Sequence, residues 1–277
     1  GQLGILLLDK LNANSLKCKV YFVFNAMIRQ FKEPVAKSIT PILAGIQSGL
    51  DYGDIEYSSY SAWNISNHLF LTSNNLEIIE QTILKYAGLM HQLKLKSVAL
   101  TISIIKQTVL SFKEKSFNKI GLIDEVFDES NVSSILGNNT TWLSILYSGK
   151  TVTNYFFGDY IQAIENARLT EKYQESNPGF YLYCVNNYYY SLALLANYKN
   201  VTPTEQKQYL KKTAANQKKM KKWAHHAACN FQHKYDLVEA EKARIFGKNV
   251  KAMNLYDRAI AGAKENEYTQ DEALGTD

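Results

Sequence analysis

Proline is scarce in this sequence, with 4 residues in 277. Because proline breaks helices and marks turns, its scarcity argues against a turn-rich all-β fold and favours helices. Long apolar runs are missing as well. The most hydrophobic stretch, residues 180–198, is interrupted by Asn186, Asn187 and Asn197, which predicts a buried helix rather than a membrane span. We therefore expect an all-α protein.

Paired cysteines are also lacking, and the opening residues are not expected to form a signal peptide. Cys18, Cys184 and Cys229 are scattered and odd in number, which argues against a disulfide framework and against a zinc site and suits a reducing compartment. The opening residues carry neither a basic flank nor a cleavage site. The net charge of +5 permits an acidic partner without requiring nucleic acid. These features predict a cytoplasmic protein.

One short stretch resembles a phosphate-binding loop, because Gly149, Lys150 and Thr151 follow one another. Such a loop needs a glycine five residues before this triplet and a buried strand ahead of it. Ser144 stands at the glycine position, and apolar residues recur around the triplet at helical spacing. We therefore expect a helix here and no nucleotide site.

Apolar residues recur at spacings of three and four along most of the chain, which predicts eleven or twelve helices and no strand. In the helix expected over 16–31, Val20, Val23, Phe24, Met27, Ile28 and Phe31 share one face. Further helices are expected over 34–53, 54–72, 74–93 and 96–113, from 141 onward, and after the capping sequence Thr202-Pro203-Thr204-Glu205. This divides the chain into helical repeats over 1–115, an irregular connector over 116–140 and further repeats over 141–277.

Two stretches share a glycine at a helix end and an alanine five residues later: Gly158 with Ala163, and Gly247 with Ala252. Ala240, Tyr256 and Ala259 complete the second pattern. It resembles the tetratricopeptide repeat, in which small residues let two antiparallel helices approach and glycine permits the tight turn between them. The resemblance implies a right-handed superhelical stack of antiparallel helix pairs. Because no fixed 34-residue step appears, we expect a divergent α-solenoid.

The segment 218–274 resembles the helical repeat region of large cyanobacterial-type signalling kinases. The phrases "KVYFVFNAMIRQFKEPV", "QSGLDYGDIEYSSY" and "YFFGDYIQAIENA" are similar to that region in the same order. In those proteins a serine/threonine kinase domain and a STAND-type AAA ATPase precede the repeats, and a GAF domain with a histidine kinase often follows. The resemblance implies a middle piece of a larger protein, without catalytic residues of its own.

Four pairs of polar residues fall on helices expected to lie inside the stack: Asn25 and Arg29, Asn64 and His68, Lys106 and Gln107, and His233 and Lys234. The first helices of stacked pairs line a groove in which peptides bind, so these side chains are candidates for partner binding. Hydrogen bonding between neighbouring helices is the alternative, and both can hold. The histidines show no metal-ligand spacing, no nucleophile stands beside a base, and no cofactor is expected.

Residues 207–223 contain seven lysines and no acid. On a helical wheel Tyr209, Thr213, Met220 and Trp223 share one face, and Lys207, Lys211, Lys218 and Lys222 share the other. A solvated face is the simpler interpretation, and a surface for an acidic partner or nucleic acid is the alternative. The sequence thus predicts a non-catalytic module that binds a protein or peptide and the flanking domains of its own chain. The alternative is a scaffold whose basic helix engages nucleic acid or an acidic surface.

Overall fold

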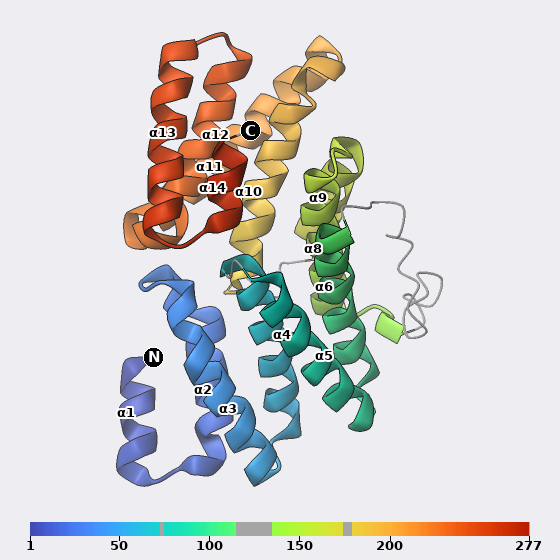
Figure 1. Ribbon diagram of the computed structural model, residues 1–277, viewed down its shortest axis with the longest axis vertical. Helices are drawn as coiled ribbons and strands as arrows, with labels where there is room; N and C mark the ends of the chain where they lie inside the picture. Colours follow the sequence, from blue (N-terminus) through green and yellow to red (C-terminus); the bar gives the residue numbers. More distant parts are fainter. Residues whose placement is uncertain (73–74, 115–134, 174–178, 277) are drawn as a thin grey trace. The chain divides into compact units, whose positions relative to one another are not determined.

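The computed structural model describes residues 1–72, 75–114, 135–173 and 179–276, and every regular element in these ranges is a helix (Figure 1). The α-helices are α1 Gln2–Leu11, α2 Lys17–Met27, α3 Ile39–Tyr52, α4 Ile55–Thr72, α5 Leu76–Gln92, α6 Lys96–Glu114, α8 Thr140–Phe156, α9 Tyr160–Tyr173, α10 Tyr181–Ala196, α11 Pro203–His226, α12 Ala228–Ile245, α13 Asn249–Glu265 and α14 Thr269–Thr276. Short 3₁₀ helices cover Asn14–Leu16, Arg29–Phe31, Val35–Ser38 and Tyr198–Asn200. The all-α prediction is confirmed for these ranges. The described part already holds more α-helices than the eleven or twelve expected.

The chain divides into two compact units. Unit 1 comprises Gly1–Leu143 with Gly179–Tyr181, and unit 2 comprises Ser144–Pro178 with Leu182–Asp277. Most of the irregular connector predicted over 116–140 lies outside the described residues.

Helix starts agree with the capping residues in the sequence. Thr202 accepts a hydrogen bond from the Glu205 amide, and the Glu205 carboxylate accepts one from the Thr202 amide, which is a complete capping box with Pro203 in the first turn. Asp54 Oδ1 accepts from the Tyr57 amide at 3.2 Å, as expected for the start of α4. Asn75 caps α5 in the same way.

The turns that close the helix pairs of unit 1 recur at a constant interval. Asn12, Gly53 and Lys94 end α1, α3 and α5 with positive φ values of 48°, 78° and 59°, and each follows the previous one by 41 residues. In all three turns the next amide donates to the carbonyl five residues before it, at 3.0, 2.7 and 2.9 Å. This is the Schellman arrangement, which satisfies the last carbonyls of a helix.

The interval of 41 residues extends to the helices that follow these turns. Cys18 of α2, Ser59 of α4 and Leu100 of α6 occupy equivalent positions and are 1%, 2% and 1% exposed. Phe22, Trp63 and Ile104 form a second equivalent set of buried residues. α2 and α6 both pack against α4. Unit 1 therefore contains a repeat whose step is 41 residues, longer than the 34 of a tetratricopeptide repeat.

Aromatic rings form much of the core of unit 1. The Trp63 ring lies 5.3 Å from the Phe180 ring and 6.1 Å from the Trp142 ring, both in edge-to-face geometry, and Phe22 contacts Phe180 at 6.2 Å. Aromatic pairs in this geometry add to the stabilisation that comes from burial alone.

In unit 2, small residues let helices approach where the sequence predicted it. Gly158 and Gly247 adopt positive φ values of 80° and 68° at the ends of α8 and α12. Ala163 packs in a cluster formed by α9, α10 and Tyr209 of α11. In a second cluster between α12 and α13, Ala240 and Ala252 pack with Ala243 and Leu255, with Tyr256 at the edge, and Ala259 is also buried.

Two local predictions were wrong. The helix expected over 16–31 ends at Met27, and a 3₁₀ turn over Arg29–Phe31 follows it. The buried side of α2 includes Cys18, Phe22 and Ala26. Val23 and Ile28, which were expected on the buried side, are 38% and 43% exposed. The helix expected over 34–53 likewise begins as a 3₁₀ turn before α3.

Candidate functional site

Arg29 is held by main-chain and side-chain oxygens within unit 1. Its Nη1 donates to Asn25 Oδ1 and to the Lys37 carbonyl, each at 2.7 Å, and its Nε lies 3.4 Å from Glu33 Oε2. Asn25 is fully buried and donates to the Tyr21 carbonyl. The pair predicted from its spacing of four residues therefore does meet, and it joins α2 to the segment before α3.

His68 forms a buried hydrogen bond between α4 and the 3₁₀ turn Val35–Ser38. Ser38 Oγ donates to the Val35 carbonyl at 2.6 Å and lies 2.6 Å from His68 Nδ1. The Ser38 hydroxyl has one proton, which it donates to the Val35 carbonyl. His68 Nδ1 therefore carries the imidazole proton and donates it to Ser38 Oγ. Complete burial lowers the pKa of His68 to about 3, and the ring is neutral. Asn64, one turn earlier, is also buried.

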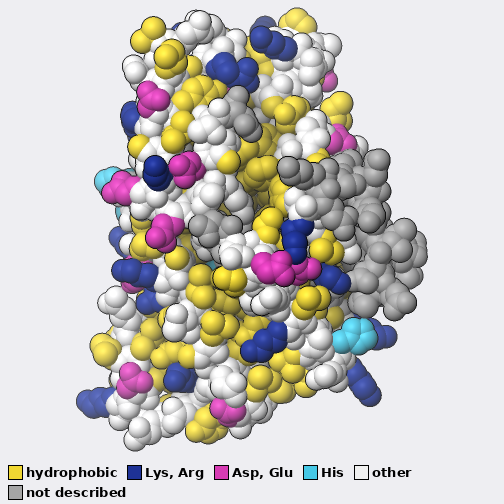
Figure 2. All heavy atoms as spheres, in the orientation of Figure 1, with side chains coloured by type: hydrophobic (Ala, Val, Ile, Leu, Met, Phe, Trp, Pro, Cys, Tyr) yellow, Lys and Arg dark blue, Asp and Glu magenta, His cyan; other side chains and the backbone are white. Residues whose placement is uncertain are grey.

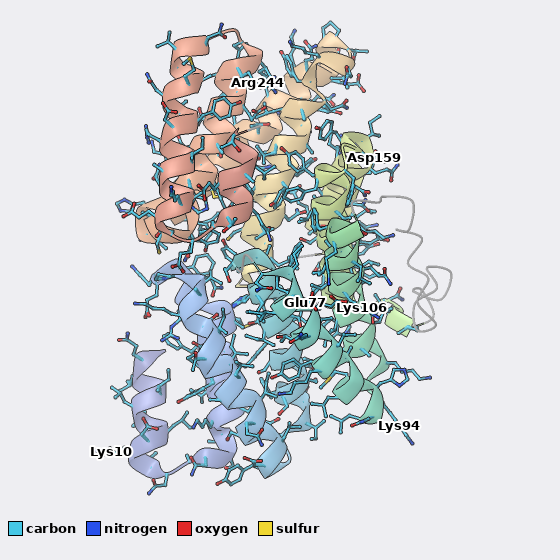
Figure 3. All side chains as sticks on the ribbon, viewed as in Figure 1. Lys10, Glu77, Lys94, Lys106, Asp159 and Arg244 are labelled. Atoms are coloured by element: carbon cyan, nitrogen blue, oxygen red, sulfur yellow. The ribbon has the colours of Figure 1, made fainter. Side chains whose placement is uncertain are left out.

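Lys106, which is labelled in Figure 3, and Gln107 lie on α6, and both are partly exposed. Of the eight predicted residues, only these two and Arg29 are not buried. The other five, Asn25, Asn64, His68, His233 and Lys234, are no more than 3% exposed. The side chains of His68, His233 and Lys234 form hydrogen bonds to neighbouring elements. Hydrogen bonding between elements was the alternative to partner binding for these residues.

His233 and Lys234 meet the carboxylate of Asp271 inside unit 2. Asp271 Oδ2 accepts from Lys234 Nζ and lies 3.0 Å from His233 Nε2. Burial and the Lys234 charge lower the pKa of His233 to about 4. The same ammonium holds the pKa of Asp271 well below its usual range, even though burial opposes this. The result is a buried ion pair beside a neutral imidazole.

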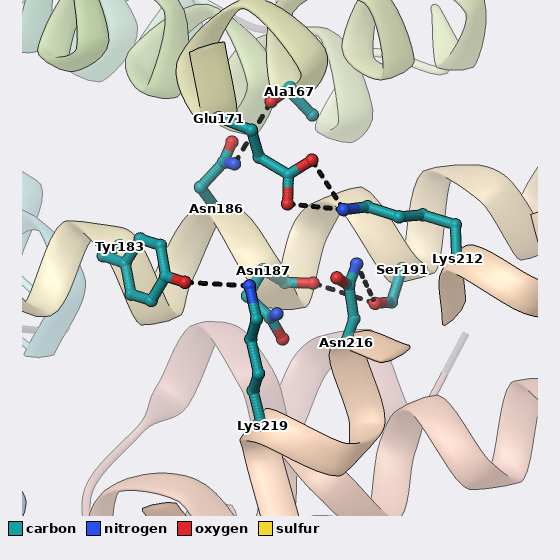
Figure 4. Close-up of polar contacts among 9 residues, drawn as sticks. All are labelled: Ala167, Glu171, Tyr183, Asn186, Asn187, Ser191, Lys212, Asn216 and Lys219. Carbon is teal, nitrogen blue, oxygen red and sulfur yellow. Dashed lines mark hydrogen bonds and ion pairs between the residues drawn. The ribbon is translucent and has the colours of Figure 1, made fainter. Parts of the chain in front are cut away.

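A second polar network, on α9, α10 and α11, was not predicted from the sequence (Figure 4). Lys212 Nζ of α11 contacts both carboxylate oxygens of Glu171 of α9, at 2.5 and 2.6 Å. The Lys212 ammonium also lies 5.1 Å from the centre of the Tyr190 ring of α10. The half-buried pair thus links α9 to α11 beside α10.

Lys219 lies seven residues after Lys212, on the same side of α11. Its Nζ donates to the Tyr183 hydroxyl of α10 at 2.9 Å. This acceptor is a hydroxyl, and the described residues place no carboxylate within ion-pair distance of Lys219. The Trp223 ring packs edge-on against Tyr183 at 5.5 Å and supports this end of the network.

Amide side chains complete the network between α9, α10 and α11. Asn186 Nδ2 donates to the Ala167 carbonyl at 3.4 Å, and Asn216 Nδ2 donates to Ser191 Oγ at 3.1 Å. The Oδ1 atoms of Asn186, Asn187 and Asn216 are buried and find no hydrogen-bond donor among the described residues. A buried acceptor without a donor is unfavourable, so these three oxygens would gain from a donor brought by water or by a ligand.

The sequence did contain a signal for this network. Asn186 and Asn187 interrupt an apolar run, and Tyr183, Asn187, Tyr190 and Ser191 recur there at spacings of three and four. Paired with Lys212 and Lys219, which are two helical turns apart, they mark a polar interface. By sequence alone, these two lysines do not differ from the five others on the same basic helix.

The structure divides the seven lysines of α11 into two groups. Lys212 and Lys219 are half-buried and make the contacts described above, whereas Lys207, Lys211, Lys218, Lys221 and Lys222 are exposed. Of the predicted apolar face, Tyr209, Thr213 and Met220 are buried and Trp223 is half-buried. On the side of the molecule that Figure 2 presents, by contrast, Lys and Arg side chains are interspersed with Asp and Glu.

Two kinds of site, a phosphate-binding loop and a metal-ligand cluster, can be checked in the described ranges. Gly149, Lys150 and Thr151 lie inside α8, so the backbone there forms helix and not a phosphate-binding loop. No three His, Cys, Asp or Glu side chains of the described chain are grouped as metal ligands. In the same ranges no helix combines the length and apolar character that crossing a bilayer requires.

Neither a family model nor a curated protein matches this sequence.

Proposed function

We propose that this chain is a non-catalytic helical-repeat module that binds a protein or peptide partner within a multidomain signalling kinase. The repeated turns at Asn12, Gly53 and Lys94 and the packing of α4 against α2 and α6 support a stack of helix pairs. Stacks of this kind form divergent tetratricopeptide-like solenoids and offer extended surfaces to other proteins.

One observation carries the proposal: Lys219 and the buried amide oxygens of Asn187 and Asn216 lie together between α10 and α11 without a full set of partners. An extended peptide carries regularly spaced N–H donors and, at acidic residues or its end, carboxylates. Its N–H groups match the amide oxygens, and its carboxylate matches Lys219 in place of the Tyr183 hydroxyl. Both amide oxygens are buried, so a peptide reaches them only when the side chains that cover them move aside.

A peptide library displayed on phage and selected on the full chain tests this proposal. We expect the selected peptides to lose binding to Lys219→Met and to keep it on Lys218→Met, since Lys218 is the adjacent exposed lysine. Equal binding to both variants would place the peptide site elsewhere and contradict the proposal.

The exposed lysines favour a second candidate, a scaffold whose basic helix binds nucleic acid or an acidic surface. Five exposed lysines lie on α11, whose only acid, Glu205, belongs to the capping box. Binding to a single-stranded oligonucleotide should then fall steeply with salt and disappear in Lys211→Glu with Lys218→Glu. Against this candidate, the aromatic residues of α11 are turned inward, where they cannot stack on bases. The double variant should leave peptide binding at Lys219 intact.

A further inference from the structure

Helix α14 is anchored to the rest of unit 2 by a charge. Its one buried residue is Asp271, whose carboxylate accepts hydrogen bonds from Lys234 of α12 and approaches His233 Nε2 at 3.0 Å. An apolar contact would be the ordinary way to dock a surface helix. The position of α14 on unit 2 therefore depends on the side chains that bind the Asp271 carboxylate.

Tyr268, directly before α14, docks beside Asp271. Its hydroxyl donates to Asn230 Oδ1 at 2.8 Å, and the centre of its ring lies 4.2 Å from Lys234 Nζ. The His233 ring lies 4.6 Å from the same ring. Tyr268 and Asp271 are three residues apart, and both side chains reach the same face of α12. Asn230, His233 and Lys234 form this face.

Lys234 depends on Asp271 for its counter-charge. Lys234 is 3% exposed, and Asp271 is the only carboxylate that the described residues place within hydrogen-bond reach of its ammonium. Burial raises the pKa values of the neighbouring Cys184 and Tyr188 well above their usual ranges, so both are neutral. Removal of one member of a buried pair leaves an uncompensated charge, which is strongly unfavourable.

Besides this pair, α14 packs closely on a neighbouring helix. It has eight residues, and a helix of that length is marginal by itself in water. Within the described chain it packs mainly on α13, where a Cβ on Gly275 would lie 2.7 Å from Ile260. The helix is thus short, closely fitted and held by one buried acid.

We propose that Asn230, His233 and Lys234 form a docking site for a helix start of the type Tyr-x-x-Asp. In this chain the site is occupied by the protein's own Tyr268 and Asp271, and a second segment with the same spacing can take their place when they are released. The site lies on α12 and does not depend on peptide binding at Lys219.

The proposal is tested by Asp271→Asn in the full chain, with Glu272→Gln as the matched control on the same helix turn. Hydrogen exchange of the amides of 269–276 should accelerate by more than about tenfold in Asp271→Asn, because the buried pair is broken, and stay near the wild-type rate in Glu272→Gln. Unchanged exchange in Asp271→Asn would overturn the proposal.

A synthetic peptide of residues 266–276, NEYTQDEALGT, tests exchange in trans. It should bind saturably to the Asp271→Asn chain and much more weakly to wild type, whose site is filled, while the same peptide with asparagine at 271 should not bind. Equal binding of both peptides would show that the site does not recognise the acid.

If Asp271→Asn fails to fold, Lys234→Met with Asp271→Leu replaces the ion pair by apolar side chains of similar length, a change that buried pairs often tolerate. This chain should remain folded and bind neither peptide. Peptide binding that survives in it would also overturn the proposal.

Discussion

A Cβ built on Gly49 of α3 would overlap the hydroxyl of Ser58 of α4, so these two helices meet with no room for a side chain. The same Cβ would lie 2.8 Å from Cys18 Sγ of α2 and 3.0 Å from the Asp54 carbonyl. Gly49 therefore sits where α2, α3 and the start of α4 converge. It follows that this contact between α2, α3 and α4 requires glycine at position 49 for the close approach and not for a special dihedral angle.

The first prediction follows from this contact. Gly49→Ala should destabilise the protein by about 1–3 kcal/mol, the usual cost of overpacking a close contact. Gly88→Ala is the control, because Gly88 lies on the exposed side of α5 with no atom near the added methyl group. It should stabilise by about 0.5–1 kcal/mol, since alanine favours helix over glycine. Urea unfolding of both variants measures these changes, and a stabilised Gly49→Ala would contradict the close packing.

The second prediction concerns pH. The folded pKa of His68 is lowered to about 3, whereas an unfolded histidine titrates near pH 6.5. Between these values the unfolded chain binds the proton and the folded chain does not, so stability falls as pH decreases through this window. Between pH 7.5 and 5 this single group accounts for about 2 kcal/mol of the loss.

His68→Asn tests the pH prediction, because its side-chain amide can still donate to Ser38 while it no longer titrates. The slope of unfolding free energy against pH should become shallower in this variant between pH 7 and 5. An unchanged slope would mean that His68 is not buried as a neutral ring. Nitrogen-15 shifts of the His68 ring in the wild type should also show the proton on Nδ1.

The third prediction concerns the crossing of α12 and α13. Ala252 is 4% exposed and packs in the cluster with Ala240 and Leu255. Ala252→Leu adds volume there and should cost about 1–3 kcal/mol. Met253→Leu, one residue later and 64% exposed, should change stability by less than about 0.5 kcal/mol. Thermal unfolding followed by circular dichroism compares them, and a harmless Ala252→Leu would show that the contact tolerates a larger residue.

The fourth prediction is that ATP does not bind at Lys150. The Gly149-Lys150-Thr151 triplet is part of α8, where the backbone N–H groups serve the helix and cannot wrap a phosphate. Titration calorimetry with Mg-ATP should give no saturable signal. Micromolar binding that disappears in Lys150→Ala would contradict the helical assignment.

Much of the local structure followed from the sequence. The capping box at Thr202 and Glu205, the cap at Asp54 and the left-handed glycines at 158 and 247 depend on neighbours within five residues, so residue type and spacing were enough to place them. The 41-residue step was also present, since Gly4-Ile5 recurs as Gly45-Ile46, but a search for the 34-residue step does not reveal it.

The candidate sites were decided by tertiary structure. Helical spacing placed Lys212 and Lys219 on a basic helix, but only the packing of α9 and α10 shows that these two point inward to Glu171 and Tyr183. Likewise, the spacing of His233 and Lys234 gave no sign of Asp271, which is 37 residues beyond Lys234. The amino-acid sequence by itself determined that the chain is helical and where most helices begin and end, because these depend on contacts between near neighbours. Which polar side chains are buried, and which acid meets which base, depends on contacts between helices far apart in the chain, and only the folded structure fixes those.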